Sequence, residues 1–288
     1  MVHSFSIESQ KRKIQTGDGP AIMGILNITP DSFSDGGKYF SLEKALSHAE
    51  KLMAEGADIL DIGGESTRPF SKPVSPEEEY NRVIPLIRAL RKKSDIPISV
   101  DTRKSLVARA ALEEGADIIN DIHGFEDPEI LSLCVEFRAA LVIMHMQGTP
   151  ETMQLAPSYT EPVREVLSFL EKKMETAEKA GMDRKQIIVD PGIGFGKSVT
   201  DNLKLISAIP EFLKLGCPLL IGASRKRFIR EILSQNGMAD LLPASPEVIS
   251  ASIALALDAA NKGAHILRVH DVAASRAALC LMKVLHKT

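Results

Sequence analysis

The chain has 288 residues, of which 44% are hydrophobic and 25% charged, and its formal net charge is −3 at pH 7. This composition is typical of globular proteins and excludes a mainly disordered chain. The small net charge gives no reason to expect nucleic acid or an anionic membrane as a partner. No apolar stretch reaches the roughly 18 residues that a membrane-spanning helix needs.

The cellular compartment can be inferred from the first residues and from the cysteines. The segment MVHSFSIESQKRK lacks the apolar core of a secretory signal, so no export is expected. Cys134, Cys217 and Cys280 are far apart and form neither a CxxC pair nor a metal-binding spacing. Reduced thiols in a cytoplasmic protein are the expectation.

Short apolar runs alternate with helix-forming segments along the whole chain. The runs are apolar on both faces, as in buried parallel strands; they are Ile22–Ile28, Asp58–Ile62, Ile96–Val100, Asp117–Ile122, Ala140–Met146, Ile187–Asp190, Pro218–Gly222 and His265–Val269. The helical composition between them is clearest in Leu42–Glu55, Pro76–Lys93, Leu106–Glu114 and Glu161–Ala180. This alternation predicts a parallel sheet covered by helices.

A glycine recurs where helices should pass into strands, in Glu55-Gly56-Ala57-Asp58, Glu114-Gly115-Ala116-Asp117 and Lys262-Gly263-Ala264-His265. A glycine just past a helix end can adopt the left-handed conformation that releases the chain. About eight such units fit the length, which favours a closed (β/α)₈ barrel, an α/β fold, over an open sheet. We expect one domain over residues 1–288, with residues 1–20 as a lead-in that covers the floor of the barrel.

Each apolar run ends in polar residues, and in such barrels the carboxyl ends of the strands form the active site. The polar residues at these strand ends fall into two chemical sets. Arg68, Lys226, Arg268 and His270 indicate an anionic ligand group, most plausibly phosphate or pyrophosphate. Asp101, Asn120 and Asp190 indicate a planar heterocycle with several N–H donors. A ligand with a polar heterocycle at one end and a pyrophosphate at the other fits both sets.

Several familiar motifs do not apply. Gly192-Ile-Gly-Phe-Gly-Lys-Ser ends like a P-loop, but the first required glycine falls on Pro191. His123, His145 and His270 lack the spacing of zinc ligands, and Ser224 lacks the GxSxG elbow of serine hydrolases. The glycine-rich segment is instead interpreted as a turn that lets a ligand approach the backbone.

The polar clusters resemble those of the dihydropteroate synthase family. The resemblance covers essentially the whole chain, in order, and rests on these motifs: Asn27-Ile-Thr-Pro-Asp-Ser-Phe-Ser-Asp-Gly-Gly, Asp61-Ile-Gly-Gly-Glu-Ser-Thr-Arg-Pro, Ser99-Val-Asp-Thr, Asp190-Pro-Gly-Ile-Gly-Phe-Gly-Lys, Ser224-Arg-Lys and Arg268-Val-His-Asp. It implies an enzyme of folate biosynthesis that joins 6-hydroxymethyl-7,8-dihydropterin diphosphate to 4-aminobenzoate, giving 7,8-dihydropteroate and pyrophosphate. It also implies Mg²⁺ as cofactor, competition by sulfonamides, and a homodimer.

The resemblance assigns roles by position. Asp101, Asn120, Asp190 and Lys226 would hold the pterin. Asn27 would contact Mg²⁺, and Asn27, Arg68, Arg268 and His270 would hold the pyrophosphate. Phe33, Thr67, Pro69 and Phe195 would shape the aminobenzoate site. Asp101, Asp190, Lys226, Arg268 and His270 would be the catalytic residues.

Two positions depart from the family pattern, and two other functions stay open. Phe70 follows Ser-Thr-Arg-Pro where a small residue is common, and Arg227 follows Ser-Arg-Lys where some members have serine. A pterin-binding methyltransferase on the same barrel would explain the Asp and Asn contacts but not the long first loop. A non-catalytic paralogue that binds pterin is the other alternative. The last segment, Val272–His286, has apolar residues at a helical spacing that fits either packing against the barrel or the dimer interface that the resemblance implies.

Overall fold

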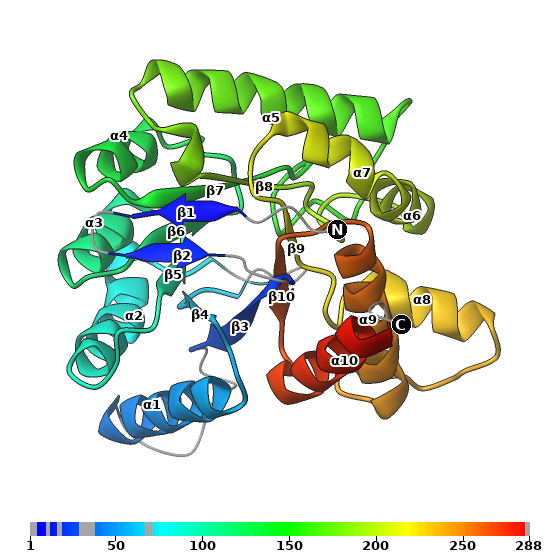
Figure 1. The fold of residues 1–288 in the computed structure, drawn as a ribbon, viewed down its shortest axis with the longest axis horizontal. Helices are drawn as coiled ribbons and strands as arrows, with labels where there is room; N and C mark the ends of the chain where they lie inside the picture. The colour runs from blue at the N-terminus through cyan, green and yellow to red at the C-terminus, as the bar shows by residue number, and fades with distance from the viewer. Residues whose placement is uncertain are drawn as a thin grey trace.

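The computed structural model describes residues 5–9, 12–15, 19–28, 38–66, 71 and 73–285. At its centre eight parallel strands are surrounded by helices (Figure 1). The strands are β3 (Ala21–Asn27), β4 (Ile59–Gly63), β5 (Ile98–Asp101), β6 (Ile118–Asp121), β7 (Ala140–Met144), β8 (Ile187–Asp190), β9 (Leu220–Ile221) and β10 (Ile266–Val269). Each of the eight runs predicted from the sequence overlaps one of them, and β3, β4 and β5 each extend one residue beyond the predicted run.

Strand pairing closes the sheet into a barrel. The hydrogen-bonded order is β8-β7-β6-β5-β4-β3-β10-β9. The two ends of this order meet at a parallel bridge between Val189 and Leu219, where the Val189 N–H donates to the Pro218 carbonyl at 2.9 Å. The predicted (β/α)₈ barrel is therefore confirmed.

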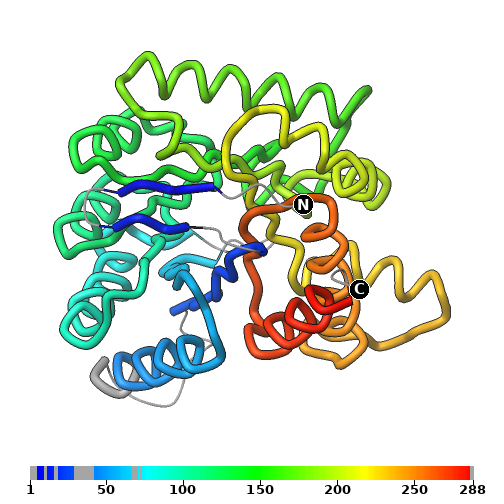
Figure 2. The backbone as a smooth tube through the Cα atoms, viewed as in Figure 1, coloured from blue at the N-terminus to red at the C-terminus, as the bar shows by residue number. Residues whose placement is uncertain are grey.

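The helices follow the strands in one direction around the barrel, as the backbone trace shows (Figure 2). They are α1 (Lys38–Ala54), α2 (Pro76–Arg91), α3 (Ser105–Glu113), α4 (Pro128–Glu136), α5 (Pro162–Lys179), α6 (Val199–Ser207), α7 (Ile209–Phe212), α8 (Arg227–Gln235), α9 (Pro246–Asn261) and α10 (Val272–Leu285), with short 3₁₀ turns at Arg184–Gln186 and Leu213–Leu215. Among the described residues, no helix is long and apolar enough to cross a membrane.

Local sequence signals explain where these elements begin and end. Helix α2 starts after Ser75, whose hydroxyl accepts a hydrogen bond from the Glu78 N–H, and Pro76 occupies its first turn. The glycines of the three recurring helix-to-strand junctions have φ angles of +95°, +98° and +103°, in Gly56, Gly115 and Gly263 respectively. These left-handed conformations confirm the predicted role of the junction glycines.

The barrel interior has two layers because strand side chains alternate in direction. The lower layer is apolar and includes Ile59, Ile118, Ile188 and Ile266. Polar residues lie two positions after these isoleucines, on the same face of the same four strands. They are Asp61, Asn120, Asp190 and Arg268. The upper layer, at the carboxyl ends of the strands, is therefore lined by charge and amide groups.

A hairpin of β1 (Ser6–Glu8) and β2 (Lys13–Gln15) closes the lower layer. Its buried side chains, Ile7 and Ile14, belong to the same apolar cluster as the interior isoleucines of the barrel. The hairpin therefore covers the amino ends of the strands, opposite the polar layer.

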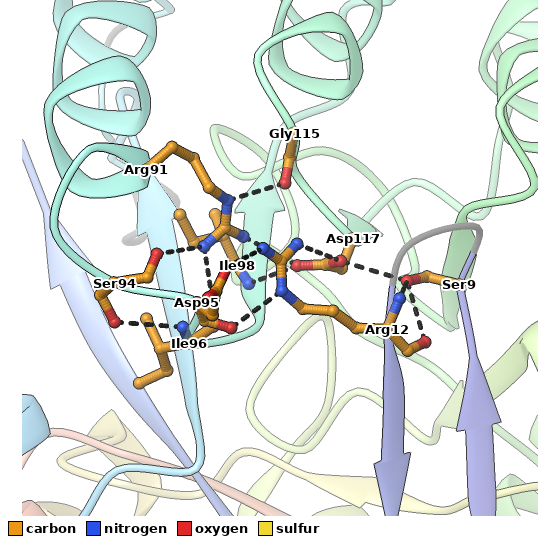
Figure 3. Close-up of polar contacts among 9 residues, drawn as sticks. All are labelled: Ser9, Arg12, Arg91, Ser94, Asp95, Ile96, Ile98, Gly115 and Asp117. Carbon is orange, nitrogen blue, oxygen red and sulfur yellow. Dashed lines mark hydrogen bonds and ion pairs between the residues drawn. The ribbon is translucent and has the colours of Figure 1, made fainter.

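Ion pairs fix this hairpin to the barrel floor around Asp117 (Figure 3). The Asp117 carboxylate is 1% exposed and accepts from Arg12 at 3.1 Å and Arg91 at 2.8 Å. It also accepts from the Ser9 hydroxyl at 3.1 Å and the Ile98 N–H at 3.0 Å. One buried carboxylate thus joins the hairpin, α2 and β5.

The Asp117→Ala substitution should lower the free energy of unfolding by about 3 kcal/mol, because it leaves two partly buried guanidinium groups without their carboxylate. Urea unfolding followed by circular dichroism measures this loss. Asp95→Ala is the matched control, since Asp95 also pairs with Arg12 but its side chain is 99% exposed. Equal losses in the two variants would contradict the role assigned to Asp117.

Candidate active site

The upper interior layer brings together side chains from six strands or the loops that follow them. Asp61 is fully buried, and Asp101, Asn120 and Asp190 are 5%, 4% and 5% exposed. Arg268 enters from β10, and Lys226 comes from the segment between β9 and α8. The residues predicted to hold the pterin are therefore gathered at one end of the barrel.

Arg268 crosses the interior and connects β10 to β4 and β5. Its Nε donates to Asp61 Oδ2 at 2.6 Å, and its Nη2 donates to Asp101 Oδ2 at 2.7 Å. Asp61 Oδ1 accepts from the Ser99 hydroxyl at 2.6 Å, and the Asn120 amide lies 3.3 Å from both Asp61 oxygens. Arg268 is predicted from the sequence to be catalytic and to hold pyrophosphate, whereas two of its three guanidinium nitrogens bond carboxylates, one of them the predicted pterin ligand Asp101.

Asp190 is oriented by the glycine-rich turn that follows β8. The Gly192 N–H donates to Asp190 Oδ1 at 2.7 Å. Further along the turn, the ring of Phe195 lies beneath Lys226, whose Nζ is 3.5 Å from the ring centroid. A Cβ at Gly194 would stand 2.9 Å from Lys226 Cδ, so this glycine gives the lysine room. The turn therefore places a pterin-site carboxylate and an apolar ring side by side.

The segments after β9 and β10 are joined by side-chain bonds. The Ser224 hydroxyl lies 3.0 Å from His270 Nδ1. Arg225 donates to the Asp271 carboxylate through Nε at 3.1 Å and Nη2 at 2.5 Å. The Ser-Arg-Lys and Arg-Val-His-Asp motifs thus form one unit, which holds His270 at the same end of the barrel as Lys226 and Arg268.

Asn27 ends β3 and pairs with Gly63 of β4. A Cβ at Gly63 would lie 3.0 Å from Asn27 Oδ1 and 3.6 Å from Asp101 Cβ, so the Asn27 amide stands close to the carboxylate layer. In the described part of the chain, no group of three or more His, Cys, Asp or Glu side chains could hold a metal ion. An amide oxygen at this position fits Mg²⁺ that takes its remaining ligands from water and substrate phosphates.

The pKa values of the buried groups reflect two opposed effects. Burial raises the pKa of Asp190 to about 6, while the Gly192 N–H and the nearby cations Lys226, Lys197 and Arg268 oppose the rise. Burial likewise raises the pKa of Asp101, opposed by Arg268. Burial and the Arg268 charge lower the pKa of Lys226 to about 7. Perturbed groups of both signs in one layer are typical of a functional site.

Four predicted site residues, Phe33, Thr67, Arg68 and Pro69, lie outside the described residues, as does Phe70. Sequence reasoning gave no role to Asp61, Ser99 or Lys197, although all three are buried at this end of the barrel. The signal that could have found Asp61 is its position two residues after Ile59 in a strand whose other face is apolar. Arg227 pairs with Glu231 on α8, with Nε 2.5 Å from the carboxylate.

The fold and this layer define an enzyme-like (β/α)₈ barrel whose open end can hold a polar heterocycle beside an anion. The family model described as "Pterin binding enzyme" matches residues 23–270. A dihydropteroate synthase of *Haemophilus influenzae* is 48% identical over 89% of this chain and 90% of its own length. The *Escherichia coli* (strain K12) dihydropteroate synthase is 44% identical over 88% of this chain and 87% of its own length. The chain belongs to the dihydropteroate synthase family of pterin-binding enzymes.

A solved structure agrees in fold as well as in sequence. *Xanthomonas albilineans* dihydropteroate synthase with 4-aminobenzoic acid has a TM-score of 0.90 and 43% identity, over 99% of this chain and 100% of that chain. The same enzyme in complex with 7,8-dihydropteroate has a TM-score of 0.87 and 41% identity, over 98% of this chain and 99% of that chain. The arrangement of strands and helices is therefore that of the family.

Affinity for a dihydropterin without phosphate should fall as the pH drops from about 8 to about 5, through the Asp190 pKa of about 6. Protonation turns an acceptor for ligand N–H groups into a donor, so the protonated site binds more weakly. Calorimetric titration across this range measures the change. The Asp190→Asn variant should bind weakly throughout and lose the part of the pH dependence that Asp190 causes, while Asp101 and Lys226, which also titrate in this range, retain theirs. An affinity that rises toward acid would contradict this account.

Proposed function

We propose that this chain catalyses the condensation of 6-hydroxymethyl-7,8-dihydropterin diphosphate with 4-aminobenzoate, giving 7,8-dihydropteroate and pyrophosphate in folate biosynthesis. The observation that carries the proposal is the buried layer in which Asp61 and Arg268 orient Asp101, with Asn120 and Asp190 beside them. Sequence identity of 44–48% to dihydropteroate synthases over most of the chain supports the same activity.

The pterin would occupy the carboxylate layer. Asp101 and Asp190 would accept its N–H groups, Asn120 can both donate and accept, and Lys226 would donate to a ring acceptor. Arg268, 2.7 Å from Asp101, opposes the rise in pKa that burial causes in that carboxyl and so favours its ionised form. The positive charge that develops on the pterin during the reaction would then face preformed carboxylates.

The diphosphate would lie toward His270, Arg268 and Asn27, with Arg68 assigned by the family resemblance. Asn27 and the substrate oxygens would hold Mg²⁺, which when bound would neutralise part of the diphosphate charge. His270, whose Nδ1 lies 3.0 Å from the Ser224 hydroxyl, would contribute a hydrogen bond to the diphosphate. These contacts would stabilise the leaving group as its negative charge grows.

The aminobenzoate would pack against Phe195, with Phe33, Thr67 and Pro69 assigned by resemblance. The related *X. albilineans* structure contains 4-aminobenzoic acid, and a *Yersinia pestis* dihydropteroate synthase structure, with a TM-score of 0.89 and 36% identity, contains a sulfonamide drug complex. We infer that sulfonamides compete for the same apolar surface in this chain. The ring of Phe195 is 5% exposed, so its neighbours hold it in place.

The reaction is a displacement at the methylene carbon of the pterin. The C–O bond to the diphosphate breaks, and its electron pair leaves with the pyrophosphate oxygen. The lone pair of the neutral arylamine forms the new C–N bond, and one amine proton is then released to water. No strong general base is required, so the task of the chain is to position both substrates and to stabilise opposite charges at the two ends of the pterin.

A coupled assay of pyrophosphate release tests the proposal against its two rivals. The expected result is release that requires both substrates and matches 7,8-dihydropteroate formation in amount. A methyltransferase would transfer a methyl group without pyrophosphate, and a non-catalytic paralogue would bind pterin without turnover. Either of these results would refute the proposed reaction.

The two halves of the site should respond differently to substitution. His270→Ala should weaken binding of the dihydropterin diphosphate by tenfold or more and leave the phosphate-free dihydropterin nearly unaffected, since each charged hydrogen bond is worth about 1.5–3 kcal/mol. Arg268→Met should weaken both ligands, because Arg268 also holds Asp101 and Asp61. Calorimetry with the two ligands measures this. If Arg268→Met lost affinity only for the dihydropterin diphosphate, the bonds of Arg268 to the carboxylates would be unimportant for pterin binding.

Helix α10 supports the homodimer that the resemblance implies. Val272, Ser275 and Leu279 are buried against the barrel. The apolar stripe noted in the sequence lies on the other side and is exposed throughout; it comprises Ala273, Ala277, Cys280, Leu281, Val284 and Leu285. Three of its members, Leu281, Val284 and Leu285, are 62%, 61% and 64% exposed. We propose that a second copy of the chain covers this stripe.

Sedimentation at micromolar concentration should therefore show a dimer for the wild type. The double substitution Leu281→Asp and Val284→Asp should give a monomer, because charges would be buried in the apolar contact. Leu203→Asp is the control, since Leu203 is a 43% exposed apolar residue on α6. A wild-type monomer would refute the interface.

A cytoplasmic location is proposed from the thiols. All three cysteines are free, and Cys134 and Cys217 are buried. Burial raises the pKa of both buried thiols, which keeps them protonated and unreactive. Such thiols suit a reducing compartment.

A further inference from the structure

Lys197 is a buried cation at the open end of the barrel, and the reaction described above gives it no part. Its side chain is 3% exposed. Its Nζ lies 2.8 Å from the Phe195 carbonyl, 2.9 Å from the Gly192 carbonyl and 3.1 Å from the His145 carbonyl. Nζ also lies 3.1 Å from His145 Nδ1. Four acceptors thus surround the Lys197 amino group, and its hydrogen-bonding capacity is used entirely within the chain.

These contacts hold a backbone segment that has little stiffness of its own. Gly192, Gly194 and Gly196 have φ angles of +69°, +82° and +58°, conformations that glycine adopts and leaves easily. The turn also fits tightly against the end of β7, because a Cβ at Gly192 would stand 1.9 Å from the His145 carbonyl oxygen. Lys197 therefore joins the turn after β8 to the end of β7 at its closest approach.

The two turn residues whose carbonyls Lys197 holds are the ones that serve the two substrates. Gly192 donates its N–H to Asp190 Oδ1 at 2.7 Å and so sets the direction of the pterin-site carboxylate. Phe195 presents its ring to Lys226 at 3.5 Å and to the proposed aminobenzoate site. Movement of either peptide would change the orientation of a group that contacts substrate.

The rest of the turn is held independently of Lys197. The Asn202 side chain accepts from the Gly194 N–H at 2.6 Å, and the Tyr159 hydroxyl donates to the Gly196 carbonyl at 2.9 Å. These two contacts hold Gly194, which lies between Gly192 and Phe195, and Gly196, which follows Phe195. The Phe195 N–H also donates to the Gly192 carbonyl at 3.1 Å, and Lys197 adds the side-chain donor that both carbonyls share. That shared donor separates the contribution of Lys197 from general support of the loop.

We propose that Lys197 is a positioning residue, whose ammonium group sets the Gly192 and Phe195 peptides and thereby orients Asp190 for the pterin and the Phe195 ring for aminobenzoate. This inference rests on the proposed function. The Lys197 charge also favours the ionised form of Asp190, since it lowers the pKa of that carboxyl against the effect of burial.

The test is Lys197→Met, which keeps the length of the side chain and removes its charge and donors. Steady-state kinetics and calorimetry with the dihydropterin are measured well below the melting temperature. We expect kcat/KM to fall tenfold or more for both substrates, because displacements of about 1 Å in a site cost up to a hundredfold in rate. The affinity for the dihydropterin should fall together with kcat/KM.

Arg91→Met is the matched control for a merely structural role. Arg91 is also a partly buried cation that bonds several carbonyls and a carboxylate, but it lies at the barrel floor (Figure 3). Both variants should melt at lower temperature, and only Lys197→Met should lose kcat/KM and dihydropterin affinity. Unchanged kinetics in Lys197→Met, or an equal change in Arg91→Met, would overturn the proposal.

A milder variant keeps the test decisive if Lys197→Met does not fold. Lys197→Gln retains two donors without the charge, and an intermediate loss is expected; wild-type kinetics and affinity in it would overturn the proposal. Dihydropterin affinity reports on Asp190 even without turnover. If the wild type released no pyrophosphate, the proposed reaction would fail, and the binding comparison would still decide the role of Lys197.

Discussion

The arrangement of this site depends on one guanidinium group that spans the inside of the barrel. Arg268 bonds Asp61 at 2.6 Å and Asp101 at 2.7 Å, and the three residues come from β10, β4 and β5. Buried carboxylates without a partner would take up protons or destabilise the fold. The shared cation offsets part of the cost of burying two carboxylates within one small volume.

Other parts of the molecule hold this group of buried charges in place. The floor of the barrel is closed by apolar side chains and by the hairpin that contributes Ile7 and Ile14, so water is excluded from below. At the open end a second set of contacts, centred on Lys197, holds the turn that carries Phe195. Folding stability is concentrated at the amino ends of the strands and chemistry at the carboxyl ends, a division common in this fold.

Much of the fold could be predicted from the sequence because periodicity and junction glycines are local signals. The same is true of the gathering of Asn120, Asp190 and Lys226, since parallel strands end on one side. The bond between Asp61 and Arg268 could not be predicted, because the two residues are far apart in sequence and their pairing depends on barrel geometry. Lys197 follows an irregular turn, where no periodicity says which side chains point inward.

We infer that Asp61 and Arg268 act together to build the proposed pterin site. A double-mutant cycle with Asp61→Asn, Arg268→Met and the double variant measures this through calorimetric affinity for 6-hydroxymethyl-7,8-dihydropterin. We expect a coupling energy of about 1 kcal/mol or more, because either single change breaks the same bonded unit. Effects that add to within about 0.5 kcal/mol would contradict it, since they would show that the two residues act on the pterin independently.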